Sequence, residues 1–287
     1  MSSCEHLTAS ARELLFLSED MRLAAIQQDS FYIDHPQSDS VLTMIENVLA
    51  VPRRMQAPCL IVTGAPGAGK SSIIKQIRDS ETLSNQIAFL DMAANPFNLK
   101  FSELLVSALG LPHGLIKFGL PRKAALPAEL AEVIKLRRIK ALVIDELHDS
   151  LLVARPEQLK NLSILKALSN HVYGLSIIGF GIDLARNALS MDEQFSRRFY
   201  SVQVDDWSES ESFRSFLAGV EQNLPLRKSS RLDGADVIGF LLENTGGRMD
   251  SIMNSIKSAA CYAIKSGEER ITIDSLAKAI SSPWGYK

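Results

Sequence analysis

The sequence predicts an α/β fold: a parallel sheet core, a helical extension at residues 1–56, the sheet domain at residues 57–206 and a small all-helical domain at residues 207–287. Three observations lead to this prediction. Strand patterns alternate with helical patterns after residue 57, a glycine-rich loop joins the first strand to a helix, and the strand patterns end at Asp206. Such alternation is typical of βαβ units, whose parallel sheets are covered by helices on both faces.

The composition is that of a globular protein with a substantial core, because 46% of its 287 residues are hydrophobic and 22% are charged. A net charge of −2 provides no overall basic field, so any DNA binding must rest on a local patch. The three cysteines are far apart, which argues against a zinc site or a disulfide framework. No run approaches the roughly 20 apolar residues of a membrane span, and we expect a cytoplasmic protein without membrane contact.

The elements of the expected fold follow from apolar spacing and from helix-start signals. Residues 1–56 show amphipathic helical patterns, interrupted at residues 31–36, where Pro36 disfavours helix at His35. After Asp206, Ser208 with a glutamate three residues later predicts a helix start, and Thr272 is expected to cap the last helix. Strands are expected at residues 59–63, 87–92, 141–144, 175–178 and 201–204.

Residues 64–71 form the pattern Gly-x-x-x-x-Gly-Lys-Ser between an apolar strand and a helical run. In this context, the backbone N–H groups of the loop converge on phosphate oxygens, and the helix N-terminus adds partial positive charge. We expect Lys70 to reach the β- and γ-phosphates of ATP and Ser71 to give its hydroxyl to Mg²⁺. The expected nucleotide-binding residues of this segment are Gly64, Ala65, Pro66, Gly67, Ala68, Gly69, Lys70, Ser71 and Ser72.

Asp145 and Glu146 follow the apolar run at residues 141–144, so both carboxylates are expected at the C-terminal end of a buried strand, where parallel sheets bind their ligands. Asp145 would hold Mg²⁺ through its water shell, and Glu146 would orient and polarise the attacking water. The alternative is that the two carboxylates only cap the following helix. His148 is assigned no role.

Two arginine motifs have both a structural and a functional interpretation. Arg197 and Arg198 close a helix that begins near Leu184, where the helix dipole favours cations. They are also suited to act as an arginine finger on the γ-phosphate bound by a neighbouring subunit. Arg248 follows a glycine pair at a helix junction, and it is either an incidental neighbour of that junction or a sensor directed at the nucleotide.

These motifs, in this order and ahead of a helical lid, resemble an AAA+ P-loop ATPase over nearly the whole chain. More narrowly, the chain resembles the TniB/TnsC family of transposition regulators from Tn7-like elements. The resemblance implies an ATPase that binds double-stranded DNA, forms rings or helical filaments on it, and links a TniQ-like target-selection protein to a transposase. The similar segments are residues 29–36, 64–71, 144–148, 178–199 and 267–272.

The same resemblance implies further site residues. Tyr32 and Pro36 would line the adenine, with simple packing as the alternative. Where the family usually has a threonine or asparagine sensor, this chain has a glycine, an isoleucine and Asp183. Either Asp183 substitutes for the sensor or sensing is weak, and we expect slow hydrolysis. The family's DNA-binding pore loops map to a region that contains four basic residues, and a solvated basic face is the alternative; these residues are Lys100, Lys117, Arg122 and Lys123.

Two other classes of function share the nucleotide motifs. A helicase loader or replication initiator would carry all of them, although such proteins often add a helix-turn-helix or a partner-binding extension. A signalling ATPase that binds only protein would carry them as well. Co-sedimentation with DNA, in the presence and absence of ATP, separates a signalling ATPase that binds only protein from the classes that bind DNA.

Overall fold

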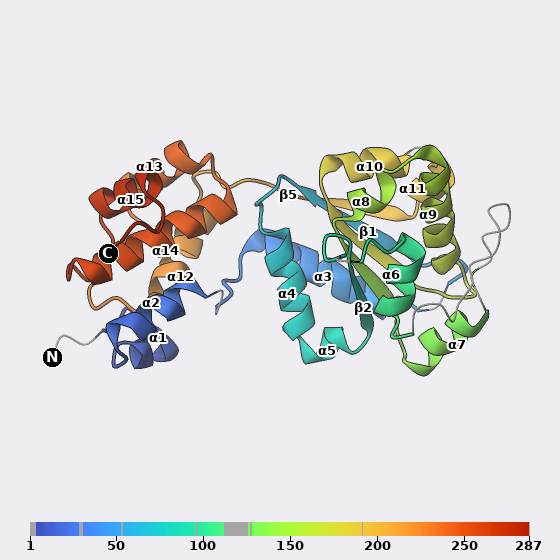
Figure 1. Cartoon of the computed structure of the whole chain (residues 1–287), viewed down its shortest axis with the longest axis horizontal. Helices are drawn as coiled ribbons and strands as arrows, with labels where there is room; N and C mark the ends of the chain where they lie inside the picture. Colours follow the sequence, from blue (N-terminus) through green and yellow to red (C-terminus); the bar gives the residue numbers. More distant parts are fainter. Residues whose placement is uncertain are drawn as a thin grey trace. The chain divides into compact units, whose positions relative to one another are not determined.

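The computed structural model describes residues 4–28, 31–52, 54–95, 97–111, 126, 128–190 and 192–286. Its contacts divide the chain into two compact units (Figure 1). The α/β unit comprises Gln37–Pro66 and Lys70–Asp205, and the helical unit comprises Met1–Pro36, Gly67–Gly69 and Asp206–Lys287. The segment 1–56, expected as one extension, is therefore divided between the two units.

The α/β unit contains five strands, all paired in parallel, in the order β2-β3-β4-β1-β5. The α/β prediction is thus confirmed. The central strands β1, β3 and β4 are buried along almost their whole length, which explains why they appear in the sequence as continuous apolar runs. The strands are β1 Cys59–Gly64, β2 Ile87–Asp91, β3 Ala141–Asp145, β4 Ser176–Gly181 and β5 Phe199–Val204.

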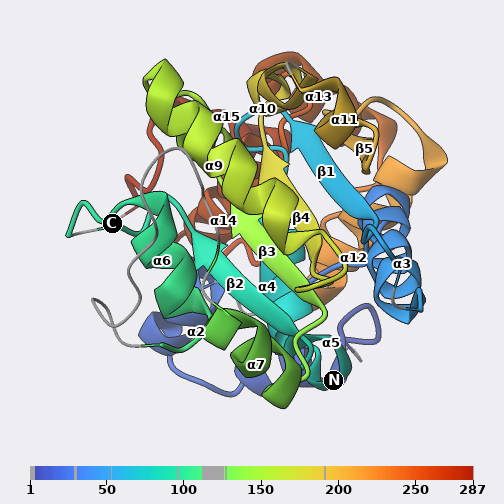
Figure 2. The ribbon, with the colours of Figure 1, turned by 90° about the vertical axis from the view of Figure 1, so that its right-hand side faces the viewer.

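Helices cover both faces of this sheet: Figure 2 shows α6 and α9 in front of the strands and α4 behind them. On the α6 and α9 face, Ile61, Leu142 and Ile144 of the strands belong to one buried cluster with Leu105 and Leu165 of the helices. The helices of this unit are α3 Pro36–Ala50, α4 Lys70–Asp79, α5 Glu81–Ser84, α6 Phe101–Ala108, α7 Ala128–Leu136, α8 Leu147–Leu151, α9 Arg155–Leu168, α10 Asp183–Ser190 and α11 Glu193–Ser196.

The helical unit combines the two ends of the described chain, because α2 packs on α14 and α1 on α12 (Figure 1). Leu23 and Ile26 of α2 lie in one buried cluster with Phe213, Leu217 and Ile256. None of the described helices is long and apolar enough to cross a membrane. The helices of this unit are α1 Ala9–Leu14, α2 Glu19–Gln27, α12 Glu211–Asn223, α13 Ala235–Thr245, α14 Met249–Lys265 and α15 Ile273–Ser281.

The two predicted helix starts of this unit have different outcomes. The Thr272 hydroxyl accepts a hydrogen bond from the Ser275 backbone N–H and caps α15, as predicted. The prediction for Ser208 is wrong, because α12 begins two residues later. There the Ser210 hydroxyl accepts a hydrogen bond from the Phe213 N–H, and its extended backbone supplies the cap geometry.

A buried ion pair ties α2 to the C-terminal helices. The Arg22 guanidinium is almost fully buried and donates to both carboxylate oxygens of Glu269, at 2.8 and 2.5 Å, and to the Pro225 carbonyl oxygen at 2.6 Å. Burial by itself raises the pKa of Glu269, but the hydrogen bond and the charge of Arg22 outweigh it and lower that pKa. The ionised carboxylate is therefore the form that the fold stabilises.

Glu269→Gln should lower the free energy of unfolding by about 3 kcal/mol at neutral pH, because it leaves the buried guanidinium without its counter-charge. A carboxylate with a lowered pKa in the folded state stabilises the fold above its unfolded-state pKa, and this stabilisation is lost as the pH falls through the folded-state pKa. The difference between wild type and variant should therefore shrink in acid. Urea unfolding at neutral and acidic pH measures both quantities.

The matched control is Glu268→Gln, because among the described residues this neighbouring glutamate forms an ion pair only with the half-exposed Arg270. An equal loss of stability in both variants would contradict a specific role for the Arg22–Glu269 pair.

Candidate nucleotide site

The glycine-rich loop connects β1 to α4 at the carboxyl edge of the sheet. Gly67 and Gly69 have φ angles of +80° and +94°, a region that residues with a Cβ rarely adopt. These two positions therefore require glycine for the tight path of the loop. Helix α4 starts at Lys70, so its free N–H groups face the same end of the sheet as the loop.

Lys70 lies beneath the start of this loop and is almost fully buried. Its Nζ donates hydrogen bonds to the carbonyl oxygens of Gly64 at 2.9 Å and Ala65 at 2.8 Å. Ser71 and Ser72 follow in the first turn of α4 and are exposed. A buried ammonium and two hydroxyls thus occupy the helix start, an arrangement suited to an anionic ligand with a bound cation.

Acidic side chains gather at the ends of the neighbouring strands. Asp145 ends β3 and lies directly beside Asp91, which ends β2. Burial raises the pKa of Asp145, and the negative charges of Glu146 and Asp91 raise it further. The backbone N–H of Glu146 donates a hydrogen bond to Asp145 Oδ1 at 3.0 Å, which lowers this pKa. Lys70 acts on the same carboxyl and lowers its pKa, so the structure brings the predicted lysine and the predicted carboxylate together.

Glu146 adopts an unusual backbone conformation for a residue with a side chain, with φ 50° and ψ 46°. Such left-handed residues cost roughly 1 kcal/mol and cluster at functional sites. The residue precedes α8, but its side chain makes no capping hydrogen bond. The alternative interpretation, in which Glu146 serves only as a helix cap, is therefore not supported.

His148, which was assigned no role from the sequence, lies next to Glu146 in the structure. Its Nδ1 lies 3.0 Å from Oε2 of Glu146, and its Nε2 lies 3.5 Å from Oδ1 of Asp149. The imidazole is mostly buried and lies beside the glutamate carboxylate. The spacing of two residues after Glu146 was visible in the sequence, but the turn that brings the two side chains together was not.

Asp91 was missed, although its position was open to inference. The strand at residues 87–92 was predicted, and it ends in a carboxylate at the sheet edge that carries Asp145. The order of the strands was the lacking information, because only the pairing of β2 with β3 makes the two aspartates neighbours.

The two arginines at the end of α11 have different surroundings. Nη1 of Arg198 donates to Ser169 Oγ at 2.7 Å, Asn170 Oδ1 at 3.0 Å and the Lys166 carbonyl oxygen at 3.3 Å. The side chain of Arg197 is 81% exposed, and Oε2 of Glu193 lies 3.9 Å away. Arg198 is therefore engaged in its own subunit, whereas Arg197 is accessible. The single helix expected before these arginines is two helices, α10 and α11.

The glycine pair before Arg248 has a structural role in the helical unit. Gly246 ends α13 in the left-handed conformation, and a Cβ on Gly247 would lie 2.0 Å from the Trp207 carbonyl oxygen. Arg248 starts α14, with Nε 4.0 Å from Oδ2 of Asp206, and it is exposed. The glycines therefore fix the junction, and the sensor role of Arg248 stays a prediction.

The other expected contacts fall in different places. In the helical unit, Tyr32 is partly buried and Pro36, the first residue of α3, is exposed. Lys100 is exposed just before α6, where its backbone N–H donates to Glu103 Oε2 at 2.8 Å. The remaining basic residues expected to contact DNA lie outside the described residues; these are Lys117, Arg122 and Lys123.

Comparison with known proteins assigns the chain to a family. Residues 22–209 match the family model described as "Bacterial TniB protein". A comparison with curated proteins gives no significant match.

Solved structures show the same fold. The chain is similar to the Orc1 protein of Aeropyrum pernix in complex with DNA, with a TM-score of 0.60 and 13% identity over 90% of this chain and 68% of that one. It is similar to Cdc6p from Pyrobaculum aerophilum, with a TM-score of 0.59 and 14% identity over 86% and 67%. It is also similar to a Walker-type ATPase of Pyrococcus abyssi, with a TM-score of 0.55 and 14% identity over 89% of this chain and 73% of that one. The fold is that of an AAA+ P-loop ATPase.

Lys70→Ala should weaken ATP binding by about 10- to 100-fold, because a charge-assisted hydrogen bond to phosphate is worth ~1.5–3 kcal/mol and no other described cation lies under the loop. Fluorescent ATP titration measures the affinity, with circular dichroism to confirm folding. Lys75→Ala, on the exposed side of α4, is the matched control. Unchanged affinity in the folded Lys70 variant would refute the assignment of the loop.

Proposed function

The chain belongs to the TniB family, and from this premise we propose that it is a cytoplasmic, ATP-dependent switch that assembles on double-stranded DNA and regulates transposition. The observation that carries the proposal is the convergence of Lys70, Asp145 and Glu146 at one edge of the sheet. Each of these residues has a separate part in binding or hydrolysing ATP. The family resemblance adds the DNA, the transposase and a TniQ-like target-selection protein as partners.

ATP binding would use the loop and the start of α4. The hydrogen bonds of Lys70 to the Gly64 and Ala65 carbonyls would be exchanged for bonds to the β- and γ-phosphates. Tyr32, Pro36 and Arg248 are proposed as further nucleotide-binding residues.

Mg²⁺ fits the charge at the sheet edge, because burial and two neighbouring carboxylates raise the pKa of Asp145 and a divalent cation there would stabilise its ionised form. Within the described residues, no group of three or more His, Cys, Asp or Glu side chains could hold a metal ion alone. This agrees with a Mg²⁺ ion bound mainly by phosphates and water, with Ser71 and Asp145 as the protein groups.

Hydrolysis would depend on Glu146 as the residue that orients and polarises water. Its left-handed backbone places it directly after Asp145, and His148 Nδ1 lies 3.0 Å from its carboxylate. In place of a threonine or asparagine sensor, Asp183 begins α10 and faces Arg186 at 3.9 Å. We therefore propose slow turnover, which suits a switch that stays assembled while ATP is bound.

Glu146→Gln should keep ATP affinity within a factor of about two and lower the turnover by about 100-fold or more, because a general base contributes roughly 10²–10⁴-fold. Phosphate release under saturating ATP measures the turnover. Asp149→Asn, in the helix α8 that follows Glu146, is the control. It tests whether the loss of another carboxylate near His148 also lowers the turnover. Normal turnover in the Glu146 variant would show that another group activates water.

Assembly would place the nucleotide at a subunit interface, with Arg197 reaching the γ-phosphate of the neighbour. The exposure of Arg197 supports this assignment, and the three hydrogen bonds of Arg198 give that residue a structural part instead. A head-to-tail contact of this kind produces a ring when it closes and a helical filament when it does not.

Arg197→Ala should leave ATP binding by the monomer intact, abolish assembly on DNA with an ATP analogue, and lower the DNA-dependent turnover by about 100-fold, the lower range for an arginine finger. Arg198→Ala should instead lower the free energy of unfolding by ~2 kcal/mol, since it removes three hydrogen bonds to partly buried acceptors. Negative-stain imaging and urea unfolding measure the two effects. Arg186→Ala is the control for Arg197, and assembly of the Arg197 variant would refute the interface.

Two observations bear on DNA. The Orc1 structure of Aeropyrum pernix is a complex with DNA, and the exposed Lys100 with Lys117, Arg122 and Lys123 would supply phosphate contacts here. A few cations per subunit suffice when assembly repeats them along the duplex. Co-sedimentation with duplex DNA, with and without an ATP analogue, tests the proposal, and the absence of ATP-dependent binding would contradict it.

The similarity to Orc1 and Cdc6p favours one alternative, a replication initiator or helicase loader. Such a protein would also bind DNA with ATP, so co-sedimentation does not separate the two. A transposition assay with the element's transposase does, because only a regulator of transposition would be required for insertion. A signalling ATPase without DNA binding is excluded by ATP-dependent co-sedimentation.

A further inference from the structure

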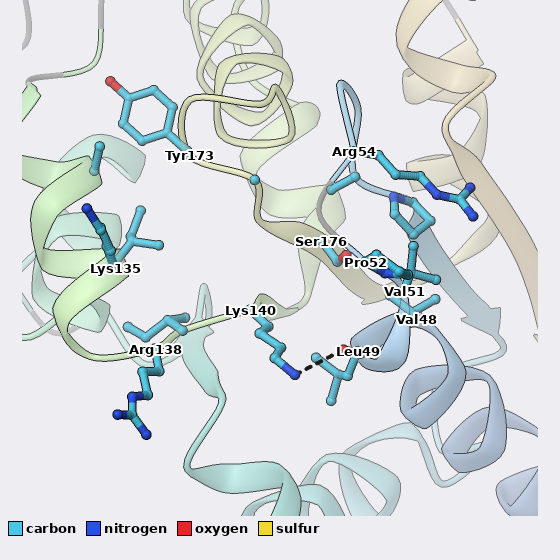
Figure 3. A pocket seen from close by; sticks show the side chains of 16 residues that line it. Val48, Leu49, Val51, Pro52, Arg54, Lys135, Arg138, Lys140, Tyr173 and Ser176 are labelled. Carbon is cyan, nitrogen blue, oxygen red and sulfur yellow. Dashed lines mark hydrogen bonds between the residues drawn. The ribbon is translucent and has the colours of Figure 1, made fainter.

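A cavity of about 350 Å³ opens at the amino edge of the sheet, opposite the carboxyl edge that carries Lys70 and Asp145. Its walls come from the end of α3, the segment that leads into β1, α7, and the residues that precede β3 and β4 (Figure 3). All of these segments belong to the α/β unit. The nucleotide proposal uses none of the residues that line it.

The lining combines apolar walls with basic side chains. Val48, Val51 and Ile139 contribute to the apolar part. No acidic residue is found among the residues that line the cavity. Four basic residues line it: Arg54, Lys135, Arg138 and Lys140. In a chain of net charge −2, this is a marked local excess of positive charge.

The cations are available to a ligand. Arg54, Lys135 and Arg138 are exposed and form no ion pair among the described residues. Figure 3 shows Arg54 and Arg138 on opposite sides of the view, with Lys140 between them, where its Nζ donates to the Leu49 carbonyl oxygen at 3.3 Å. Charges spread around an opening suit an extended anion better than a single compact one.

We infer that this cavity binds an acidic segment of a partner protein that inserts an apolar side chain between aspartates or glutamates. The apolar side chain would fill the cavity, and the carboxylates would pair with Lys135, Arg138 and Arg54 at its rim. A nucleic-acid backbone would satisfy the cations but leave the apolar walls without a partner.

The expected binding is of moderate affinity and depends on salt. Exposed ion pairs contribute little individually, so the apolar anchor must supply the central contact while the rim charges set specificity and association rate. Loss of rim charges should therefore weaken binding without affecting the nucleotide site, because the two sites share no residue.

The experiment uses the full chain and fluorescein-labelled peptides that carry leucine, isoleucine or phenylalanine between aspartates. Comparison peptides have lysine in place of aspartate, or serine in place of the apolar residue, and a short labelled DNA duplex is the nucleic-acid probe. Fluorescence anisotropy should show binding of at least one acidic apolar peptide. That binding should fall about tenfold in Lys135→Glu/Arg138→Glu and in Val51→Asp, and also when salt is raised.

The matched control, Arg12→Glu/Lys278→Glu, reverses the charge of one arginine and one lysine in the helical unit. Both side chains are exposed. It should bind the peptide as wild type does, and all variants should keep wild-type ATP affinity, so that failure here is distinct from failure of the nucleotide site. Three results would each overturn the inference: no binding of any acidic apolar peptide, equal binding of the serine peptide, or equal weakening in the control. Duplex binding that depends on Lys135 and Arg138 without peptide binding would reassign the cavity to nucleic acid.

Discussion

The parallel direction of all five strands is the constraint on which the rest of the site depends. When every strand runs the same way, every carboxyl end falls on one edge, and the segments that follow the strands meet there. The phosphate-binding loop after β1, Asp91 at the end of β2, and Asp145 with Glu146 at the end of β3 are distant in the sequence. They meet at one edge because β2 pairs with β3, β3 with β4 and β4 with β1, all in parallel. A single antiparallel strand among them would carry its residues to the opposite edge.

That edge is electrostatically unbalanced in a way that suits its proposed ligands. Lys70 is buried under the loop and hydrogen-bonded to two carbonyl oxygens, so its charge is held where phosphate would lie. Beside it, burial and two carboxylate neighbours raise the pKa of Asp145. A polyphosphate with Mg²⁺ would satisfy both conditions together, because the phosphate supplies negative charge to the lysine and the cation supplies positive charge to the carboxylates. The strained backbone of Glu146 and its contact with His148 add a third fixed group at the same place.

The sequence was sufficient for those parts of the fold that depend on local pattern. Buried central strands appear as apolar runs, and the glycine-rich loop has a spacing set by phosphate geometry. The missing parts all depend on contacts between distant segments. Nothing local to residues 1–36 indicates that Arg22 pairs with Glu269, and so the N-terminal helices were not expected to join the C-terminal ones. Arg197 and Arg198 are identical in type and adjacent in sequence, and only the acceptors on Ser169 and Asn170 distinguish them. His148 was likewise hidden by a turn whose direction the sequence does not reveal.

The two edges of the sheet are joined by β3, whose residues lead from Lys140 at the cavity to Asp145 at the nucleotide site, yet this strand is a poor route for coupling. It is paired on both sides along its length and buried in the core, so a shift of β3 would disturb two ladders at once. Helix α3 is the better candidate. Its last turn lines the cavity and provides the Leu49 carbonyl that Lys140 contacts, while its first residue, Pro36, marks the boundary between the two units. A helix can move as a rigid body at smaller cost than a central strand, because its backbone hydrogen bonds are internal. A ligand in the cavity would therefore act on α3 more readily than on β3.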